Sequence, residues 1–134
     1  MKWLGIVLAG GVALLVGGAL LYSWWTNPRV IRELREYPQG ERAQKVMLLT
    51  LPSGKALPVN YLRDDGTVYA AADFPWWREL RGEGGRGSVL IRGETLHGHI
   101  RVVEDDPELR KSVFARLRPT APRWMGALVV IALD

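Results

Sequence analysis

The sequence predicts a mainly β domain with a few helices, folded as a small closed or half-closed barrel and preceded by one transmembrane helix. Three observations predict it. Residues 3–28 carry no charge, later residues form short apolar runs separated by turn residues, and few stretches have helical periodicity. The chain has 134 residues. Without its first 25 residues, about 109 remain, enough for one compact core.

The first element is the membrane segment, residues 1–26. Trp3 to Trp25 is 23 residues long, and at ~1.5 Å per residue it spans a ~30 Å hydrocarbon core with some tilt. Trp3 marks one interface, and Tyr22, Trp24 and Trp25 mark the other. A cleaved signal peptide is the alternative, but bulky residues stand where its cleavage site would be. We therefore favour a retained single-pass anchor.

Basic residues predict the orientation of this anchor. Lys2 precedes the span, whereas Arg29, Arg32 and Arg35 follow it, with Arg42 and Lys45 further on. The positive-inside rule places the C-terminal domain in the cytoplasm and the N-terminus outside, at the inner (cytoplasmic) membrane. The same arginines are expected near anionic headgroups, although an ordinary solvated helix face explains them equally well.

Small residues recur along one face of the anchor. Gly5, Ala9, Ala13 and Gly17 are spaced four apart, which makes a shallow groove. Close packing through small residues favours association of helices in lipid, so we expect contact with another transmembrane helix, from a second copy or a larger complex. The alternative is that glycine and alanine are simply common in membrane helices.

Residues 27–44 are predicted to form a juxtamembrane amphipathic helix and linker, and residues 45–134 the barrel domain. Asn27 and Pro28 resemble a helix start. Apolar residues then share one face as far as Tyr37, and the segment from Pro38 to Gly40 ends the helix.

The barrel domain begins with three predicted strands and a short helix. The strands are Val46 to Leu51, Leu57 to Leu62 and Thr67 to Ala72, separated by turn residues that include an Asp-Asp-Gly hairpin signal. Pro75 opens the helix, Phe74 to Leu80, and the glycine-rich residues 82–87 predict a flexible break.

A second hairpin, a helix and a final strand complete the order. The hairpin joins Ser88 to Ile91 with Thr95 to Val103. Asp106 and Pro107 announce a helix. Its predicted buried stripe is Leu109, Val113, Phe114 and Leu117, and the last strand is Gly126 to Leu133. Short strands with hairpin turns and few helices favour a barrel.

From Tyr37 to Asp134 the sequence resembles the deazaflavin-dependent nitroreductase family, which belongs to the split-barrel flavin-binding superfamily. The resemblance is carried by LLTLPSGKALPVNYLRDDGTVYAAA, FPWWREL and SVLIRGETLHGHIRVVEDDPELRKSVFARLRPTAP. It is best from Arg101 to Arg110. It implies a split β-barrel of the FMN-binding type.

The resemblance also implies a cofactor site. The family holds the phosphate-bearing tail with a basic glycine-containing turn, which corresponds to Ser53, Gly54 and Lys55 here. Trp76 and Trp77 become candidates to stack on the cofactor ring, and Arg78 and Arg81 to add phosphate charge. The turn and the loop before Pro75 are shorter than in the family. A plain connecting turn, core packing and a solvated helix face are the respective alternatives.

Other chemistries have little support in the sequence. The chain has no cysteine and two histidines, and His97 and His99 share a strand face without a third metal ligand, so we expect no metal site. Asp105, Asp106 and Glu108 are explained by helix capping. The net charge of +4 comes from alternating acids and bases, which does not indicate nucleic-acid binding.

Two functional hypotheses follow. The first is a single-pass accessory subunit of a respiratory or photosynthetic type of membrane complex, with a non-catalytic split barrel as a cytoplasmic contact module and no cofactor. The alternative is a membrane-tethered reductase that uses deazaflavin or FMN on quinone-like or nitro compounds. In that case the cofactor would supply the chemistry and the protein the binding and orientation.

Overall fold

The computed structural model of the protein describes residues 28–122 and 124–134. Among these residues no helix is both long and apolar enough to span a membrane. The predicted anchor lies outside the described residues, together with its small-residue face (Gly5, Ala9, Ala13 and Gly17) and its interfacial aromatic residues (Trp3, Tyr22, Trp24 and Trp25).

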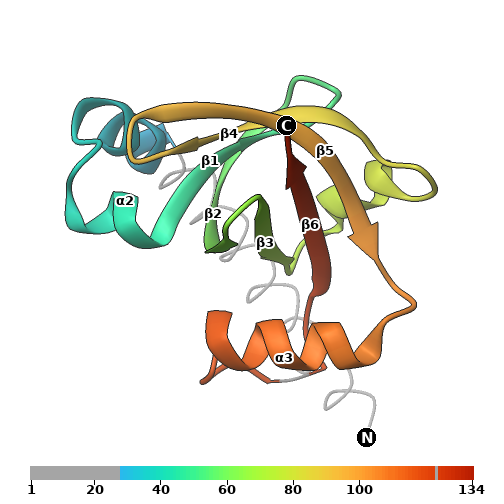
Figure 1. Cartoon of the computed structure of the whole chain (residues 1–134). Helices are drawn as coiled ribbons and strands as arrows, with labels where there is room; N and C mark the ends of the chain where they lie inside the picture. The colour runs from blue at the N-terminus through green and yellow to red at the C-terminus, as the bar shows by residue number, and fades with distance from the viewer. Residues whose placement is uncertain (1–27, 123) are drawn as a thin grey trace, which may run out of the picture.

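Six antiparallel strands form a closed barrel, in the order β1-β2-β3-β6-β5-β4 (Figure 1). The strands are β1 (Val46–Thr50), β2 (Ala56–Asp64), β3 (Thr67–Ala72), β4 (Gly85–Ile91), β5 (Glu94–Val103) and β6 (Ala127–Leu133). The barrel closes where Leu48–Thr50 of β1 pair with Ser88–Leu90 of β4. The predicted mainly β barrel with a few helices is therefore confirmed.

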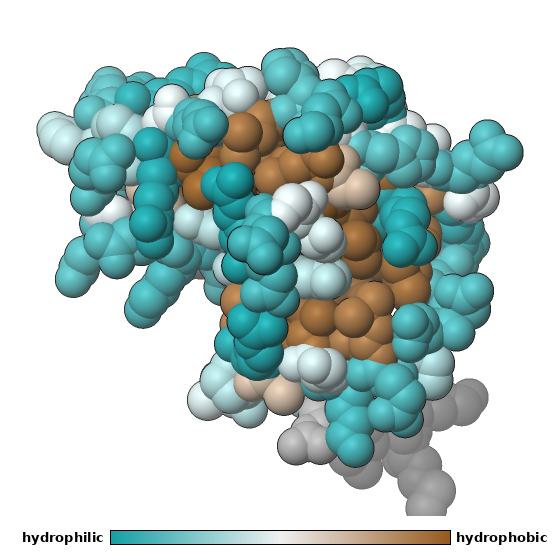
Figure 2. Space-filling view, in the orientation of Figure 1, coloured by the Kyte–Doolittle hydropathy of each residue, from teal (hydrophilic) through white to brown (hydrophobic). Residues whose placement is uncertain are grey.

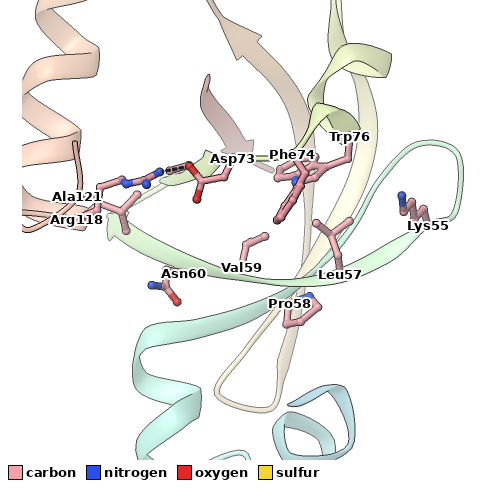
Figure 3. A pocket seen from close by; sticks show the side chains of 12 residues that line it. Lys55, Leu57, Pro58, Val59, Asn60, Asp73, Phe74, Trp76, Arg118 and Ala121 are labelled. Carbon is pink, nitrogen blue, oxygen red and sulfur yellow. Dashed lines mark hydrogen bonds and ion pairs between the residues drawn. The ribbon is translucent and has the colours of Figure 1, made fainter. Parts of the chain in front are cut away.

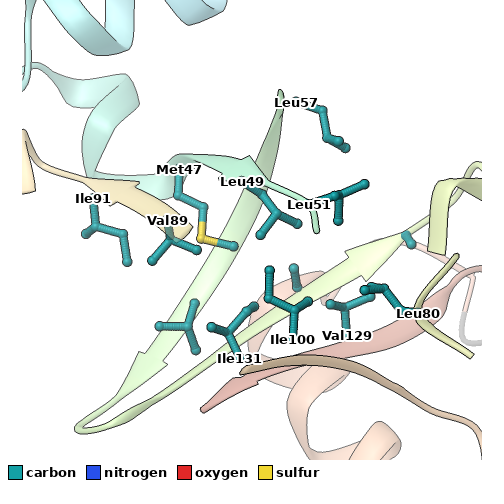
Figure 4. Close-up of a cluster of buried hydrophobic side chains, with 13 residues drawn as sticks. Met47, Leu49, Leu51, Leu57, Leu80, Val89, Ile91, Ile100, Val129 and Ile131 are labelled. Atoms are coloured by element: carbon teal, nitrogen blue, oxygen red, sulfur yellow. The ribbon is translucent and has the colours of Figure 1, made fainter. Parts of the chain in front are cut away.

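Alternate side chains of the strands fill the interior. Because successive residues of a strand point to opposite sides, Met47 and Leu49 of β1 face inward together with Val129 and Ile131 of β6 (Figure 4). Leu80 closes this core from outside the strands and is fully buried.

Two strands also bury their outer side chains, which explains their uninterrupted apolar sequences. Leu128 and Val130 of β6 pack with Val113 and Phe114 of α3 (Pro107–Leu117), which lies across one end of the barrel (Figure 1). Leu48 of β1 packs against two helical segments instead. A strand covered on both faces needs no polar alternation.

Those two helical segments lie N-terminal to the barrel. Residues 28–36 are helical, in agreement with the predicted juxtamembrane helix, and Leu34 is its buried residue. A further helix, α2 (Glu41–Lys45), adds Ala43 to the same cluster. The sequence did not predict α2, which is a single short turn without side-chain caps.

The glycine-rich break predicted over residues 82–87 is wrong in its second half. Gly85, Arg86 and Gly87 belong to β4 and pair with β5. The helix opened by Pro75 is present as a 3-10 helix, η1 (Pro75–Leu80). The predicted cap of α3 is also present, because the Asp106 carboxylate accepts a hydrogen bond from the backbone N–H of Leu109 at 3.0 Å.

Candidate functional site

A pocket of about 570 Å³ lies between β2, the start of η1 and the segment after α3 (Figure 3). It is lined by Lys55, Leu57, Pro58, Val59, Asn60, Ala71, Asp73, Phe74, Trp76, Leu117, Arg118 and Ala121. Most of these side chains are apolar, and the polar ones gather at its two ends (Figure 3). The pocket therefore suits a ligand with an apolar body and polar ends.

An ion pair forms one end of this pocket. Arg118 Nη1 donates to Asp73 Oδ1 at 2.7 Å. The Arg118 side chain is only 16% exposed and its guanidinium lies 5.6 Å from the ring centre of Phe114, whereas the Asp73 side chain is 39% exposed. Gly126, at φ +85°, passes so close that a Cβ there would lie 2.9 Å from Arg118 Nη1 and 3.0 Å from Asp73 Oδ1. The pair is thus held in place by ring and backbone.

Aromatic residues line the opposite part of the pocket. Phe74 is 46% exposed, and Trp76 is half-buried against the barrel core. Trp77, the second predicted stacking residue, lines a separate hollow between β3, β5 and β6, and the Arg81 guanidinium lies 4.8 Å from its ring centre. The two tryptophans therefore do not serve one pocket.

In the turn predicted to bind phosphate, Ser53 to Lys55, several polar groups form hydrogen bonds within the protein. Gly54 donates its N–H to the carbonyl of Leu51 at 2.8 Å, and the N–H of Lys55 is 3.5 Å from Ser53 Oγ. Ser53 Oγ in turn donates to Glu79 Oε1 at 3.0 Å. Only the Lys55 side chain reaches the pocket, at the end far from the Asp73–Arg118 pair (Figure 3).

The remaining predicted residues lie elsewhere. Arg78 is exposed on η1 and does not line the pocket of Lys55 and Trp76. Arg29, Arg32 and Arg35 are exposed on helix 28–36. His97 is exposed, and His99 Nε2 contacts the carbonyl of Glu83. In the part of the chain that the structure describes, no group of three metal-ligating side chains is present.

Sequence reasoning missed three polar residues of the pocket: Asn60, Asp73 and Arg118. Asp73 is the first residue after β3, and Arg118 is the first residue after α3. The two are 45 positions apart, so no local pattern joins them. The signal that could have found Asp73 and Arg118 is their chemistry, since each is a charged residue directly after a strand or helix that carries buried apolar side chains.

The shifted pKa values belong to ion pairs outside this pocket. The hydrogen bonds and charge of Arg116 hold the pKa of Asp64 below its ordinary value. In the same way Arg86 lowers the pKa of Asp134 at the C-terminus. Both carboxylates are acceptors fixed by arginine, an arrangement typical of structural ion pairs on a surface.

Comparison with known proteins gives structural likeness alone. No family model and no curated protein matches the chain. Among solved structures it is similar to a protein from Listeria innocua named as a pyridoxamine 5'-phosphate oxidase, with 17% identity over 77% of this chain and 93% of that one, at a TM-score of 0.48.

General stress protein 26 from Bacillus anthracis gives 22% identity over 76% of this chain and 90% of that one, with a TM-score of 0.48. A protein from Bacteroides thetaiotaomicron, named for 5-nitroimidazole antibiotic resistance, is 11% identical over 69% of this chain and 75% of that one, with a TM-score of 0.44. The function proposed below therefore depends on this chain's own residues.

Proposed function

We propose that the chain is a single-pass accessory subunit of a larger membrane protein complex of the respiratory or photosynthetic type, and that its barrel is a non-catalytic contact module on the cytoplasmic side. One observation carries the proposal. The Ser53 hydroxyl and the backbone N–H groups of Gly54 and Lys55, in the turn that the sequence resemblance assigns to a cofactor phosphate, are bonded within the protein.

Charge at this turn supports the same proposal. Ser53 Oγ already donates to the Glu79 carboxylate, so a phosphate placed at the hydroxyl would meet a second anion. Phosphate sites depend on clustered N–H donors and cations. Here the turn supplies one lysine, Lys55, and its serine is bonded to a glutamate, while Arg78 and Trp77 do not line the pocket of Lys55.

The attachment of the barrel to the predicted anchor also fits a contact module. The helical residues 28–36 follow closely on the predicted anchor (residues 1–26) in the sequence, and Leu34 fixes them to the cluster of Ala43 and Leu48 on the barrel wall. The sequence therefore leaves little room for a long linker between the predicted anchor and the domain. A barrel held so close to the bilayer is placed to contact the cytoplasmic parts of a neighbouring membrane protein.

The surface of the barrel offers apolar contact area. Figure 2 shows apolar side chains reaching the surface on one face, bordered by hydrophilic side chains. Among the described residues, Tyr37, Phe74 and Trp124 are large hydrophobic residues that are exposed. Exposed aromatic residues are enriched at protein interfaces.

Purification of the full chain in a mild detergent tests the proposal. We expect a partner at fixed stoichiometry, and we expect Ala13→Leu or Gly17→Leu to release it, because a larger side chain keeps the helices apart. Val7→Leu, on the opposite side of the predicted helix, is the matched control and should retain the partner. A wild-type chain that migrates as a free monomer would contradict the proposal.

The pocket itself favours one second candidate, a membrane-tethered reductase that binds deazaflavin or FMN. The observation in its favour is the exposed ring of Phe74 beside Trp76, with the Lys55 side chain lining the same pocket. The full chain would be titrated with each cofactor and compared with Phe74→Ala and Lys55→Gln. Absence of binding at ~100 μM, which corresponds to about 5.5 kcal/mol, would remove this candidate.

A further inference from the structure

The pocket between β2, η1 and the segment after α3 has charged groups at both ends, and only one end is electrically balanced. At the balanced end Arg118 donates to Asp73, and the two charges offset each other. At the other end lies Lys55, and within the described residues no carboxylate forms an ion pair with its ammonium. Glu79, which accepts the hydroxyl of Ser53, does not line the pocket. This balance favours a ligand with one negative charge at the Lys55 end.

The backbone of Lys55 is held in an ordered turn. Its carbonyl accepts the N–H of Leu51 at 2.9 Å, and the N–H of Gly54 bonds back to the carbonyl of Leu51 at 2.8 Å. Gly54 has a φ of +91°, a conformation that glycine adopts without strain. A cation presented from an ordered turn has less freedom to lose when a ligand binds.

Apolar side chains lead away from Lys55 along β2. Because residues of an extended chain alternate between two sides, Lys55, Leu57 and Val59 share one side. Figure 3 shows Leu57 and Val59 pointing toward Phe74 across the pocket. The Phe74 ring is 46% exposed and Trp76 is half-buried, so both rings have surface left to cover. At ~3.3 Å per residue, Lys55 and Val59 are about 13 Å apart, which calls for a long apolar ligand.

Charge and length together define the class of ligand. A phosphate monoester carries about −1.5 to −2 at neutral pH and needs clustered donors, whereas this pocket offers one uncompensated cation. A carboxylate carries a single charge, and the apolar walls suit an alkyl chain. We propose that the pocket binds the anion of a long-chain carboxylic acid, with the carboxylate at Lys55 and the chain between Val59 and Phe74. This inference does not depend on the accessory role, and the chain would cover the ring of Phe74 that the reductase candidate assigns to a flavin.

Photolabelling of the full chain in phosphatidylcholine nanodiscs tests the proposal. The probe is dodecanoate with a diazirine on its chain, used at about pH 8, where the carboxylate is ionised and lysine protonated. Adducts that excess dodecanoate removes should lie within residues 55–60 and 74–76. Lys55→Gln should weaken this competition about two- to fivefold, the range expected for an exposed ion pair, and Lys55→Arg should restore it. Lys111→Gln is the matched control, because it removes an exposed lysine that does not line the pocket.

Dodecanol, which has the same chain without the charge, separates binding in the pocket from partitioning into lipid. In the wild-type chain dodecanoate should compete better than dodecanol, and in Lys55→Gln the two should compete alike. Partitioning is the same for every variant, so a difference between variants reports on the pocket. The proposal is overturned if excess dodecanoate removes no adduct from the two segments, if dodecanol competes equally in the wild type, or if Lys111→Gln has the effect of Lys55→Gln. Absence of a partner subunit in detergent would contradict only the accessory role.

Discussion

The ion pair between Asp73 and Arg118 is partly buried, so its contribution to the stability of the fold can be measured by substitution. In Asp73→Asn the Arg118 guanidinium, 16% exposed, keeps its position over Phe114 but loses its carboxylate. We expect a loss of about 1–2 kcal/mol in the free energy of unfolding, less than the roughly 1.5–3 kcal/mol usual for a hydrogen bond to a charged group, because the Asp73 side chain is 39% exposed and partly solvated. Thermal unfolding followed by circular dichroism should show it as a drop of several degrees in Tm.

The matched control is Asp64→Asn. Its partner Arg116 is 54% exposed, and an exposed ion pair adds little stability because both groups remain solvated when they are apart. We therefore expect a smaller drop in Tm than for Asp73→Asn. If the two variants were equally destabilised, burial would not be what distinguishes the Asp73–Arg118 pair.

Arg116 governs the titration of Asp64. It donates two hydrogen bonds to that carboxylate, at 3.0 and 3.1 Å, and with its charge lowers the pKa of Asp64. A lowered pKa in the folded state means that the pairing stabilises the fold above the ordinary carboxyl range, and that this contribution is lost as pH falls through the folded pKa.

Arg116→Gln should therefore raise the pKa of Asp64 to its ordinary range, as measured by the pH dependence of its carboxyl ¹³C shift in NMR. The pKa of Asp134, which Arg86 lowers, is the internal control and should stay where it is. An Asp64 pKa that does not move in Arg116→Gln would mean that another group lowers it.

The glycines at the start of β4, Gly85 and Gly87, explain why this part of the strand was not predicted. A Cβ at Gly87 would lie 2.3 Å from the carbonyl oxygen of Thr50 and 2.4 Å from Ile100 Cδ1. The strand therefore needs glycine there, because neighbouring strands approach too closely for any side chain. In the sequence the same glycines indicate a loop, since the close approach is a property of the closed barrel and not of the segment.

We expect the helical residues before the barrel, 28–36, to unfold locally while the barrel stays folded. Leu34 is 2% exposed and packs only in the cluster formed with Ala43 and Leu48, apart from the barrel interior. Leu34→Ala should cost about 2–4 kcal/mol locally. Hydrogen exchange should accelerate in residues 28–36 while β5 and β6 keep their protection.

Arg35→Ala is the control for this variant, because Arg35 is exposed on the same helix. It should leave exchange in residues 28–36 nearly unchanged. If Leu34→Ala accelerated exchange throughout the barrel instead, the helix would belong to the cooperative core rather than to a separately opening unit.

At the scale of the whole molecule, local signals predicted most strands but not the site. Turn residues such as Asp65 and Gly66 specify where each hairpin reverses, so the order of strands was readable from the sequence. The pairing of β1 with β4, which closes the barrel, joins segments about 40 residues apart and has no local signature. The pocket forms where strand β2, the start of η1 and the segment after α3 meet, and because these are far apart in the sequence, Asn60, Asp73 and Arg118 were not predicted.

Orientation in the membrane is the remaining prediction, and the chain is well suited to its measurement because it contains no cysteine. Ser112→Cys places a single thiol on the exposed side of α3, and Lys2→Cys places one before the predicted anchor. The excess of arginine after the span predicts a cytoplasmic barrel. In intact cells an impermeant maleimide should label Lys2→Cys but reach Ser112→Cys only after lysis. Labelling of Ser112→Cys before lysis would reverse the orientation, and with it the side of the membrane on which a partner contacts the barrel.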